Sequence, residues 1–280
     1  MSAAAKRIVV CGGNGFLGSR ICNRSGEPKW NAVTSSATPP VWAHKVTWES
    51  ADILRPATYV SLLTGADYVI HSMGILLEAD YKAVVSGQES PISGLSRAFS
   101  GAPRPANPID RNVKEGTNED IRPPETKQQL TYENMNRDSA IMLAQEADHA
   151  KASAFVYISA AAGAPVLPAR YITTKREAED TIASRFPRMR DVFVRPPFLY
   201  DPSRPMTMGM AAMTGMGAMF NTVTGGVLGG FMGAAGTKPL KVETVAEAVV
   251  EALEDESVRG PVEVPEIEKL AEKAWRKNML

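Results

Sequence analysis

A short apolar run that breaks into three spaced glycines constrains the fold of this chain more than any other feature. Residues 8–10 (Ile-Val-Val) predict a buried strand, and glycines follow at positions 12, 15 and 18. The first glycine allows a tight turn, the second lets the backbone approach a pyrophosphate, and the third lets the next helix pack against the strand. That helix, expected over 16–21, offers free N–H groups to phosphate. The stretch predicts a dinucleotide-binding turn rather than a glycine-rich turn that binds nothing.

Six residues of this turn are expected to contact the cofactor: Gly12, Asn14, Gly15, Phe16, Leu17 and Gly18. Asp52 follows a predicted strand, where its carboxylate could bond the adenine amino group or simply cap a helix. Arg24 could bind a 2′-phosphate through two parallel hydrogen bonds, or be a solvated loop charge. We therefore expect NAD(P) as the cofactor, with NADP slightly favoured.

Composition excludes several classes of protein. The 31 Lys and Arg residues balance the 31 Asp and Glu residues, which argues against a nucleic-acid-binding protein. Two cysteines, Cys11 and Cys22, cannot form a disulfide scaffold or a zinc site, and three scattered histidines give no metal-ligand pattern. The first seven residues carry no apolar signal region and are too short for an amphipathic transit helix. Residues alone therefore indicate the cytosol or an import route without cleavage, and no metal.

Predicted strands and helices alternate along most of the chain. Strands are expected over 45–48 (leading into 51–53), 66–72, 154–159 and 191–195, and helices over 55–65, 132–147, 171–186 and 243–253, with Thr131 as a cap. A last strand-and-helix pair is expected over 263–280. This alternation predicts an α/β fold with a Rossmann-like, doubly wound parallel sheet. The first crossover is shortened, because the breakers at 23–28 end the helix early and no convincing second strand follows.

Two segments interrupt the pattern. Residues 85–129 are rich in Ser, Pro, Gly and charge, and we interpret them as a disordered surface insertion rather than a lid. Residues 206–237 hold no charged residue and nine glycines, which suits a flexible lobe over the site, a membrane-surface or polyprenyl contact, or a membrane span. We therefore expect an NAD(P)-binding domain over 1–200 and a small C-terminal substrate lobe over 201–280.

Candidate catalytic residues follow the third predicted strand. Tyr171 and Lys175 lie four residues apart, on one face of a helix, so that the lysine could lower the pKa of the phenol. Such a phenol can protonate a carbonyl oxygen as hydride arrives, and Ser159 at the strand end could orient that carbonyl. Alternatively, Lys175 only anchors ribose hydroxyls and Tyr171 is a packed aromatic side chain.

Taken together, the motifs resemble those of an atypical short-chain dehydrogenase/reductase of the extended, epimerase-like type. The residues that carry this resemblance are 12–18 (GGNGFLG), 51–53 (ADI), 71–78 (HSMGILLE), 132–141 (YENMNRDSAI), 157–160 (YISA), 171–179 (YITTKREAE) and 194–200 (VRPPFLY). On these motifs Ile53, Ser72, Lys175 and Pro196 join the expected cofactor contacts. The combination is similar to the fungal mitochondrial dehydrogenase-like subunit of coenzyme Q biosynthesis and, more distantly, to the NADPH-binding accessory subunit of respiratory complex I.

This resemblance implies a mitochondrial protein on the matrix side of the inner membrane, associated with the coenzyme Q biosynthetic complex. It implies bound NAD(P) but leaves catalysis open. Our first hypothesis is an NAD(P)-binding, oxidoreductase-like complex subunit that supports ubiquinone synthesis. The alternatives are an active ketoreductase or epimerase on a small or quinone-like substrate, and a non-catalytic scaffold with a structural nucleotide.

Overall fold

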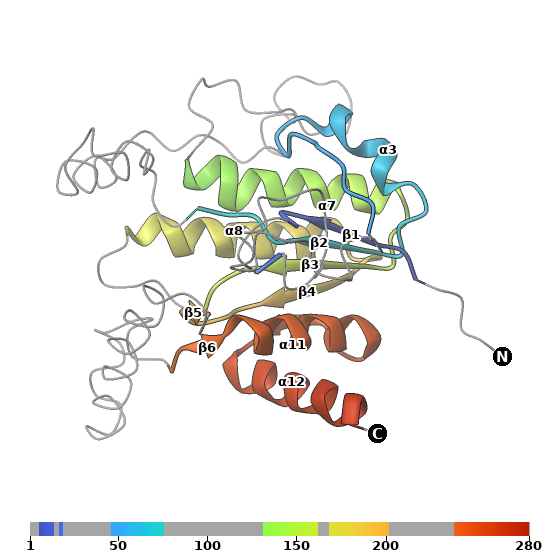
Figure 1. Ribbon diagram of the computed structural model, residues 1–280. Coiled ribbons are helices and arrows are strands. Elements are labelled where there is room, and N and C mark those ends of the chain that lie inside the picture. Colours follow the sequence, from blue (N-terminus) through green and yellow to red (C-terminus); the bar gives the residue numbers. More distant parts are fainter. Residues whose placement is uncertain are drawn as a thin grey trace, which may run out of the picture.

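A parallel sheet forms the centre of the molecule. The computed structural model describes residues 6–13, 17–18, 46–75, 131–161, 168–201 and 238–279. Within them, five strands pair in the order β1–β2–β3–β4–β7 (Figure 1), and all four pairings are parallel. Their bounds are β1 Ile8–Cys11, β2 Tyr68–His71, β3 Ala154–Ile158, β4 Arg190–Val194 and β7 Gly260–Val262. Two short strands, β5 (Leu199–Tyr200) and β6 (Leu240–Lys241), form a separate parallel pair. The predicted Rossmann-like parallel sheet is confirmed.

Helices cover both faces of the sheet (Figure 1). On one face lie α3 (Val60–Leu63), α7 (Ser139–His149) and α8 (Ala169–Arg185), and on the other lie α11 (Val242–Glu254) and α12 (Val264–Met279). Side chains alternate between the faces of a strand, so β3 sends Phe155 to the α7 layer and Val156 to the α11 layer. Both residues are fully buried. Burial on both faces explains why β3 and the centre of β2 are apolar.

The helix before β3 begins with an irregular turn. Thr131 accepts a hydrogen bond from the Asn134 amide (3.1 Å), which confirms the predicted cap. The six residues Glu133–Asp138 form a π-helical turn, η3, which leads directly into α7. A π-turn adds one residue per turn and is frequent at functional sites. It places several polar side chains inside the protein.

One predicted strand is wrong. Residues 46–50 form no strand in the structure; Val46 and Trp48 are only half-buried, and Thr47 and Glu49 are exposed. Apolar and polar side chains therefore do alternate between the protein and the solvent, but the segment pairs with no strand of the described sheet. The predicted helix over 55–65 is a short 3-10 turn, η2 (Pro56–Thr58), followed by α3.

The C-terminal residues complete the central sheet. β7 pairs with β4, and α11 and α12 share a core with β2, β3 and β4. Residues 238–279 thus belong to the same core as the strands before them. The remainder of the predicted lobe, 202–237, and the predicted insertion lie outside the described residues, so the division at residue 200 stays a prediction.

Two further expectations concern regions near the described residues. Among the described strands, β1 is the last strand at its side of the sheet. The first crossover falls within 19–45, outside the described residues, so its shortening stays a prediction. No described helix combines the length and the apolar character that crossing a bilayer demands.

Candidate nucleotide-binding and active site

The glycine turn leaves no room for a side chain at two of its positions. Gly12 has φ +86°, in the left-handed region, and an added Cβ would lie 2.8 Å from Met73 Cγ. A Cβ on Gly18 would collide with the backbone carbonyl of Gly12 and lie 2.9 Å from Ser72 Oγ. The start of the first helix therefore packs directly on the end of β1. Close approach of backbone at this place is what a dinucleotide turn requires.

Ser72 lies beside this turn at the end of β2. Its amide donates to the Cys11 carbonyl (2.9 Å), which aligns the two strand ends. Its hydroxyl oxygen is buried and has no hydrogen-bond partner among the described residues. A buried hydroxyl without a partner is costly, so this atom is suited to bind a polar group that enters the turn. The predicted contacts Asn14, Gly15, Phe16 and Arg24 lie outside the described residues.

Four other predicted cofactor residues are packed or hydrogen-bonded within the protein. Leu17 is buried in the core next to α11, and Ile53 is buried against α7. The Asp52 carboxylate accepts from the Leu54 amide (3.0 Å) and lies 3.4 Å from Arg55 Nε, so it caps its own turn. That geometry matches the capping alternative for Asp52. Pro196 is buried, and its carbonyl accepts from the Ala161 amide (2.9 Å), which joins the ends of β3 and β4.

Lys175 is buried at the carboxyl end of the sheet, only 4% exposed. Its Nζ donates to the Ile158 carbonyl (3.1 Å) and lies 5.1 Å from the ring centre of Tyr157 and 5.9 Å from that of Tyr171. Burial lowers the pKa of Lys175 to about 7, against an opposing effect of Glu179. Among the described residues the Ile158 carbonyl is the one hydrogen-bond acceptor of this amine, so its other N–H groups could donate to a polar ligand.

Tyr171 lies on the same helix face as Lys175, as predicted, but the expected effect on its acidity is wrong. Burial raises the pKa of Tyr171 to about 12, and only Arg176 opposes the rise. The Lys175 amine lies over the face of the ring, where it makes a cation–π contact. Tyr171 also packs edge-on against Tyr132, with ring centres 6.0 Å apart. The phenol is therefore neutral at physiological pH.

Ser159 directly follows β3 and is 4% exposed. Its hydroxyl accepts a hydrogen bond from Arg176 Nη1 (2.9 Å), and its amide donates to the Val194 carbonyl (2.8 Å). Ser159, Tyr171 and Lys175 thus gather at the carboxyl end of β3, where open α/β sheets bind ligands. The sequence did not single out Arg176, although it follows Lys175 in the quoted motif.

Asn136 is a second functional candidate that sequence reasoning missed. Its amide group bonds Ile75 twice: Oδ1 accepts from the Ile75 amide (2.8 Å) and Nδ2 donates to the Ile75 carbonyl (3.1 Å). Tyr157 donates its hydroxyl proton to the Asn136 carbonyl, which the π-turn leaves accessible. Asn136 therefore fixes the loop 72–75. A Cβ on Gly74 would lie 3.5 Å from Lys175 Nζ, so this loop joins the glycine turn to Lys175.

An ion network supports the site from behind. Glu179 is 2% exposed and accepts from Arg176 Nη1 (2.6 Å) and from the Arg195 guanidinium. Arg195 Nη1 also donates to Glu263 (2.6 Å), which lies just before α12. The chain Ser159–Arg176–Glu179–Arg195–Glu263 links the site to the C-terminal layer. Hydrogen bonds to these two carboxylates raise the pKa of Arg195.

His71 is an internal residue of the sheet. It is fully buried, its Nε2 lies 2.9 Å from Ser139 Oγ, and burial lowers its pKa to about 3. The imidazole is therefore neutral at physiological pH. Among the described residues, no group of three or more His, Cys, Asp or Glu side chains could hold a metal ion.

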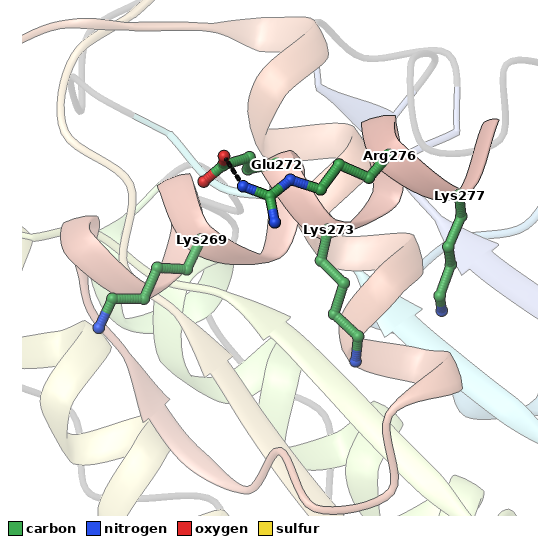
Figure 2. Close-up of a pocket in the computed structure, with 5 residues that line it drawn as sticks. All are labelled: Lys269, Glu272, Lys273, Arg276 and Lys277. Atoms are coloured by element: carbon green, nitrogen blue, oxygen red, sulfur yellow. Dashed lines mark hydrogen bonds and ion pairs between the residues drawn. The ribbon is translucent and has the colours of Figure 1, made fainter. Parts of the chain in front are cut away.

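A surface hollow on α12 offers no comparable site. It is lined by Lys269, Glu272, Lys273, Arg276 and Lys277 (Figure 2). Figure 2 shows Arg276 reaching back to Glu272 on its own helix. Lys273 and Lys277 both bond Glu251, a buried carboxylate of α11 (2.8 and 2.7 Å). These lysines neutralise acidic residues of α11, so most of the positive charge of the hollow is compensated.

Comparison with known proteins places the chain by sequence and by fold. It is 35% identical over 222 residues to MIOREX complex component 2 of Saccharomyces cerevisiae, an alignment covering 71% of this chain and 74% of the yeast protein. No model of a known protein family matches the chain.

Solved structures of epimerases and reductases share the fold. UDP-N-acetylglucosamine 4-epimerase from Methanobrevibacter ruminantium is 14% identical with a TM-score of 0.51, covering 94% of this chain and 77% of that one. UDP-glucuronic acid 4-epimerase from Bacillus cereus, in complex with NAD, is 16% identical with a TM-score of 0.50 (92% and 78%). Vestitone reductase from alfalfa is 15% identical with a TM-score of 0.51 (92% and 76%).

Proposed function

The chain belongs to the family of MIOREX complex component 2, and from this membership and the geometry of the site we propose that it is an NAD(P)-binding, oxidoreductase-like subunit of a protein complex. The observation that carries the proposal is the glycine turn: Gly12 and Gly18 leave no space for a side chain, and the buried Ser72 hydroxyl beside them has no hydrogen-bond partner in the described part of the chain. A protein of the same fold has been solved with NAD, which supports a nicotinamide dinucleotide as the ligand.

The residues present fit such a cofactor. The turn at Gly12 and Gly18 would hold the pyrophosphate, Ser72 would supply a hydrogen bond, and Lys175 would bind the ribose hydroxyls near the nicotinamide. When bound, the cofactor supplies or accepts a hydride. If the subunit is a catalyst, Ser159 and the Tyr171 phenol would bind the oxygen of a carbonyl substrate, and the phenol would give that oxygen its proton.

Finer parts of the proposal rest on the sequence motifs. We place the protein in mitochondria, at the matrix side of the inner membrane, in a complex that supports coenzyme Q synthesis. Residues 206–237, uncharged and rich in Met and Gly, would contact the membrane surface or a polyprenyl tail. NADP is slightly preferred over NAD through Arg24, and residues 201–280 contribute the substrate lobe. Titration of the full chain with NADH and NADPH tests the core of the proposal. A chain that binds neither nucleotide would contradict it.

Tyr171→Phe separates a catalyst from a nucleotide-binding subunit. The change removes one hydroxyl and keeps the ring, which packs on Tyr132, so folding and nucleotide affinity should be retained. Loss of a general acid lowers rates by roughly 10²–10⁴-fold. We expect quinone synthesis in cells carrying Tyr171→Phe to stay near normal, because the raised pKa of Tyr171 indicates a phenol that has not been activated. A fall of two orders of magnitude with nucleotide binding intact would identify a catalyst instead.

Nucleotide affinity should depend on pH through Lys175. In the free protein burial holds its pKa at about 7, so above pH 7 the amine is mostly neutral. The ribose hydroxyl oxygens would accept hydrogen bonds from the charged amine, and the negative cofactor would favour that form, so nucleotide binding raises the pKa of Lys175. Binding therefore takes up a proton, and affinity falls as pH rises above 7, by at most about tenfold per pH unit. Calorimetry at pH 7 and pH 9 in two buffers measures the proton uptake. Lys175→Arg, which stays charged, should abolish this dependence, and a persisting dependence would assign it to another group.

A further inference from the structure

Arg176 lies between Ser159 and the buried carboxylate of Glu179. The guanidinium donates from Nη1 to Ser159 Oγ (2.9 Å) and to Glu179 Oε1 (2.6 Å). From Nη2 it donates to the Ala160 and Ala161 carbonyls (2.7 and 3.2 Å). These four bonds use all four terminal N–H groups of the side chain. Arg176 is therefore committed to the protein and is not free to bind a substrate itself.

Two consecutive cationic residues clamp the end of β3. Lys175 holds the Ile158 carbonyl (3.1 Å), and Arg176 holds the next three residues, Ser159 to Ala161. Glu179, one helical turn after Arg176, is fixed in turn by Arg195. The guanidinium is thus held in one geometry by Glu179 on α8 and by the residues that follow β3, and Arg195, just after β4, fixes Glu179.

The direction of the Ser159 bond decides what its hydroxyl can do. A hydroxyl has one proton to donate and two lone pairs to accept with. In the described part of the chain, the Ser159 oxygen accepts from Arg176, and no described group accepts its proton. A cationic donor on the oxygen draws electron density from it, which strengthens the remaining O–H as a donor. The hydroxyl is left to donate to an electron-rich oxygen from outside.

We propose that Arg176 is a positioning residue that makes Ser159 a hydrogen-bond donor toward the carbonyl oxygen of a substrate. Its charge and its four bonds fix the Ser159 oxygen and leave the proton for the ligand. The proposal rests on the proposed function, since it takes Ser159 as the residue that binds the substrate oxygen. It also restricts the substrate to one whose oxygen accepts a hydrogen bond, such as a ketone or quinone. A purely structural tie between α8 and β3 is the competing explanation.

A thiol placed at position 159 reports the electrostatic effect without a substrate. The full chain carrying Ser159→Cys is titrated by the ultraviolet absorbance of the thiolate, with the unmodified chain subtracted to remove Cys11 and Cys22. The same titration is made with Arg176→Met added. The other ionisable groups around the end of β3, namely Tyr157, Tyr171, Lys175 and Glu179, are identical in both proteins. The difference between the two midpoints therefore belongs to Arg176.

We expect the midpoint to rise by about one pH unit or more when Arg176→Met is added, since a cation beside a thiol favours the thiolate. Arg185→Met, an exposed arginine on the same helix, is the matched control and should leave the midpoint unchanged. Arg176→Lys keeps the charge and should give a midpoint between the two. Equal midpoints with and without Arg176, in proteins that melt cooperatively, would overturn the proposal and leave only the structural tie.

The outcome is independent of the cofactor. Arg176→Met alone should keep the nucleotide affinity of the unmodified chain, because no bond of Arg176 reaches the glycine turn or the loop 72–75. Loss of nucleotide binding in the unmodified chain would refute the proposed function but would not move the thiol midpoints. If Arg176→Met fails to fold, the pair Arg176→Lys and Arg176→Gln gives the same comparison of charged and neutral side chains.

Discussion

Nucleotide binding should weaken by roughly tenfold to hundredfold when Gly18 is replaced by valine. The first atom of the new side chain would already overlap the Gly12 carbonyl and press on Ser72 Oγ, so the helix must move away from the end of β1. Overpacking of this kind costs about 1–3 kcal/mol, which corresponds to roughly a tenfold to hundredfold weaker affinity if the strain is relieved only in the nucleotide-free state. Quenching of intrinsic fluorescence by NADH and NADPH measures the dissociation constants.

A matched glycine provides the control for this experiment. Gly260 also has a left-handed backbone (φ +71°), but an added Cβ would meet nothing within 4 Å. Asparagine tolerates that conformation, so Gly260→Asn should fold and bind nucleotide as the unmodified chain does. Unchanged affinity in Gly18→Val would contradict the assignment of the turn as the pyrophosphate site.

The second large effect is expected for Glu179→Gln. The carboxylate is buried and joins Arg176 to Arg195, so removing its charge leaves two guanidinium groups facing each other. Breaking a buried ion pair by removing one partner typically costs about 3–5 kcal/mol, and the partial exposure of both arginines reduces this to about 2–3 kcal/mol. Urea unfolding of the nucleotide-free chain gives the change in free energy.

The neighbouring residue supplies the control. Asp180 is exposed on the same helix, and Asp180→Asn should change the free energy of unfolding by less than about 0.5 kcal/mol. If Glu179→Gln unfolds at the same urea concentration as Asp180→Asn, the network contributes no stability and the assigned role of Glu179 is wrong.

Much of the fold could be predicted because apolar residues determine it. The runs at 66–72, 154–159 and 191–195 each have an apolar centre, and they form β2, β3 and β4 at the expected places. The run at 45–48 has the same alternation as a strand but remains at the surface, since nothing in its own residues states whether a partner strand is present. Strand pairing depends on distant residues, and local patterns do not contain them.

The sequence predicted which residues come together at the site, but not their pKa values or their hydrogen bonds. Spacing placed Tyr171 and Lys175 on one helix face, and the strand end located Ser159 near them. Sequence could not reveal that burial would lower the pKa of Lys175 and raise that of Tyr171, because both effects come from the packed surroundings. It also missed Asn136 and Arg176, whose roles consist of bonds to residues far away in the chain, such as Ile75 and Ser159.

The position of β7 at the end of the sheet has a consequence for how the chain folds during synthesis. β4 gains its outer neighbour from residues 260–262, and α11 and α12, which share a core with the strands on one face, also come after residue 241. Until the ribosome releases these residues, Val156 and Val192 lack the α11 and α12 layer on that face. All five strands pair over long sequence separations, which slows folding. We expect the nascent chain to need chaperone protection until its last helix emerges, and deletion of α12 to cause aggregation rather than a shorter soluble protein.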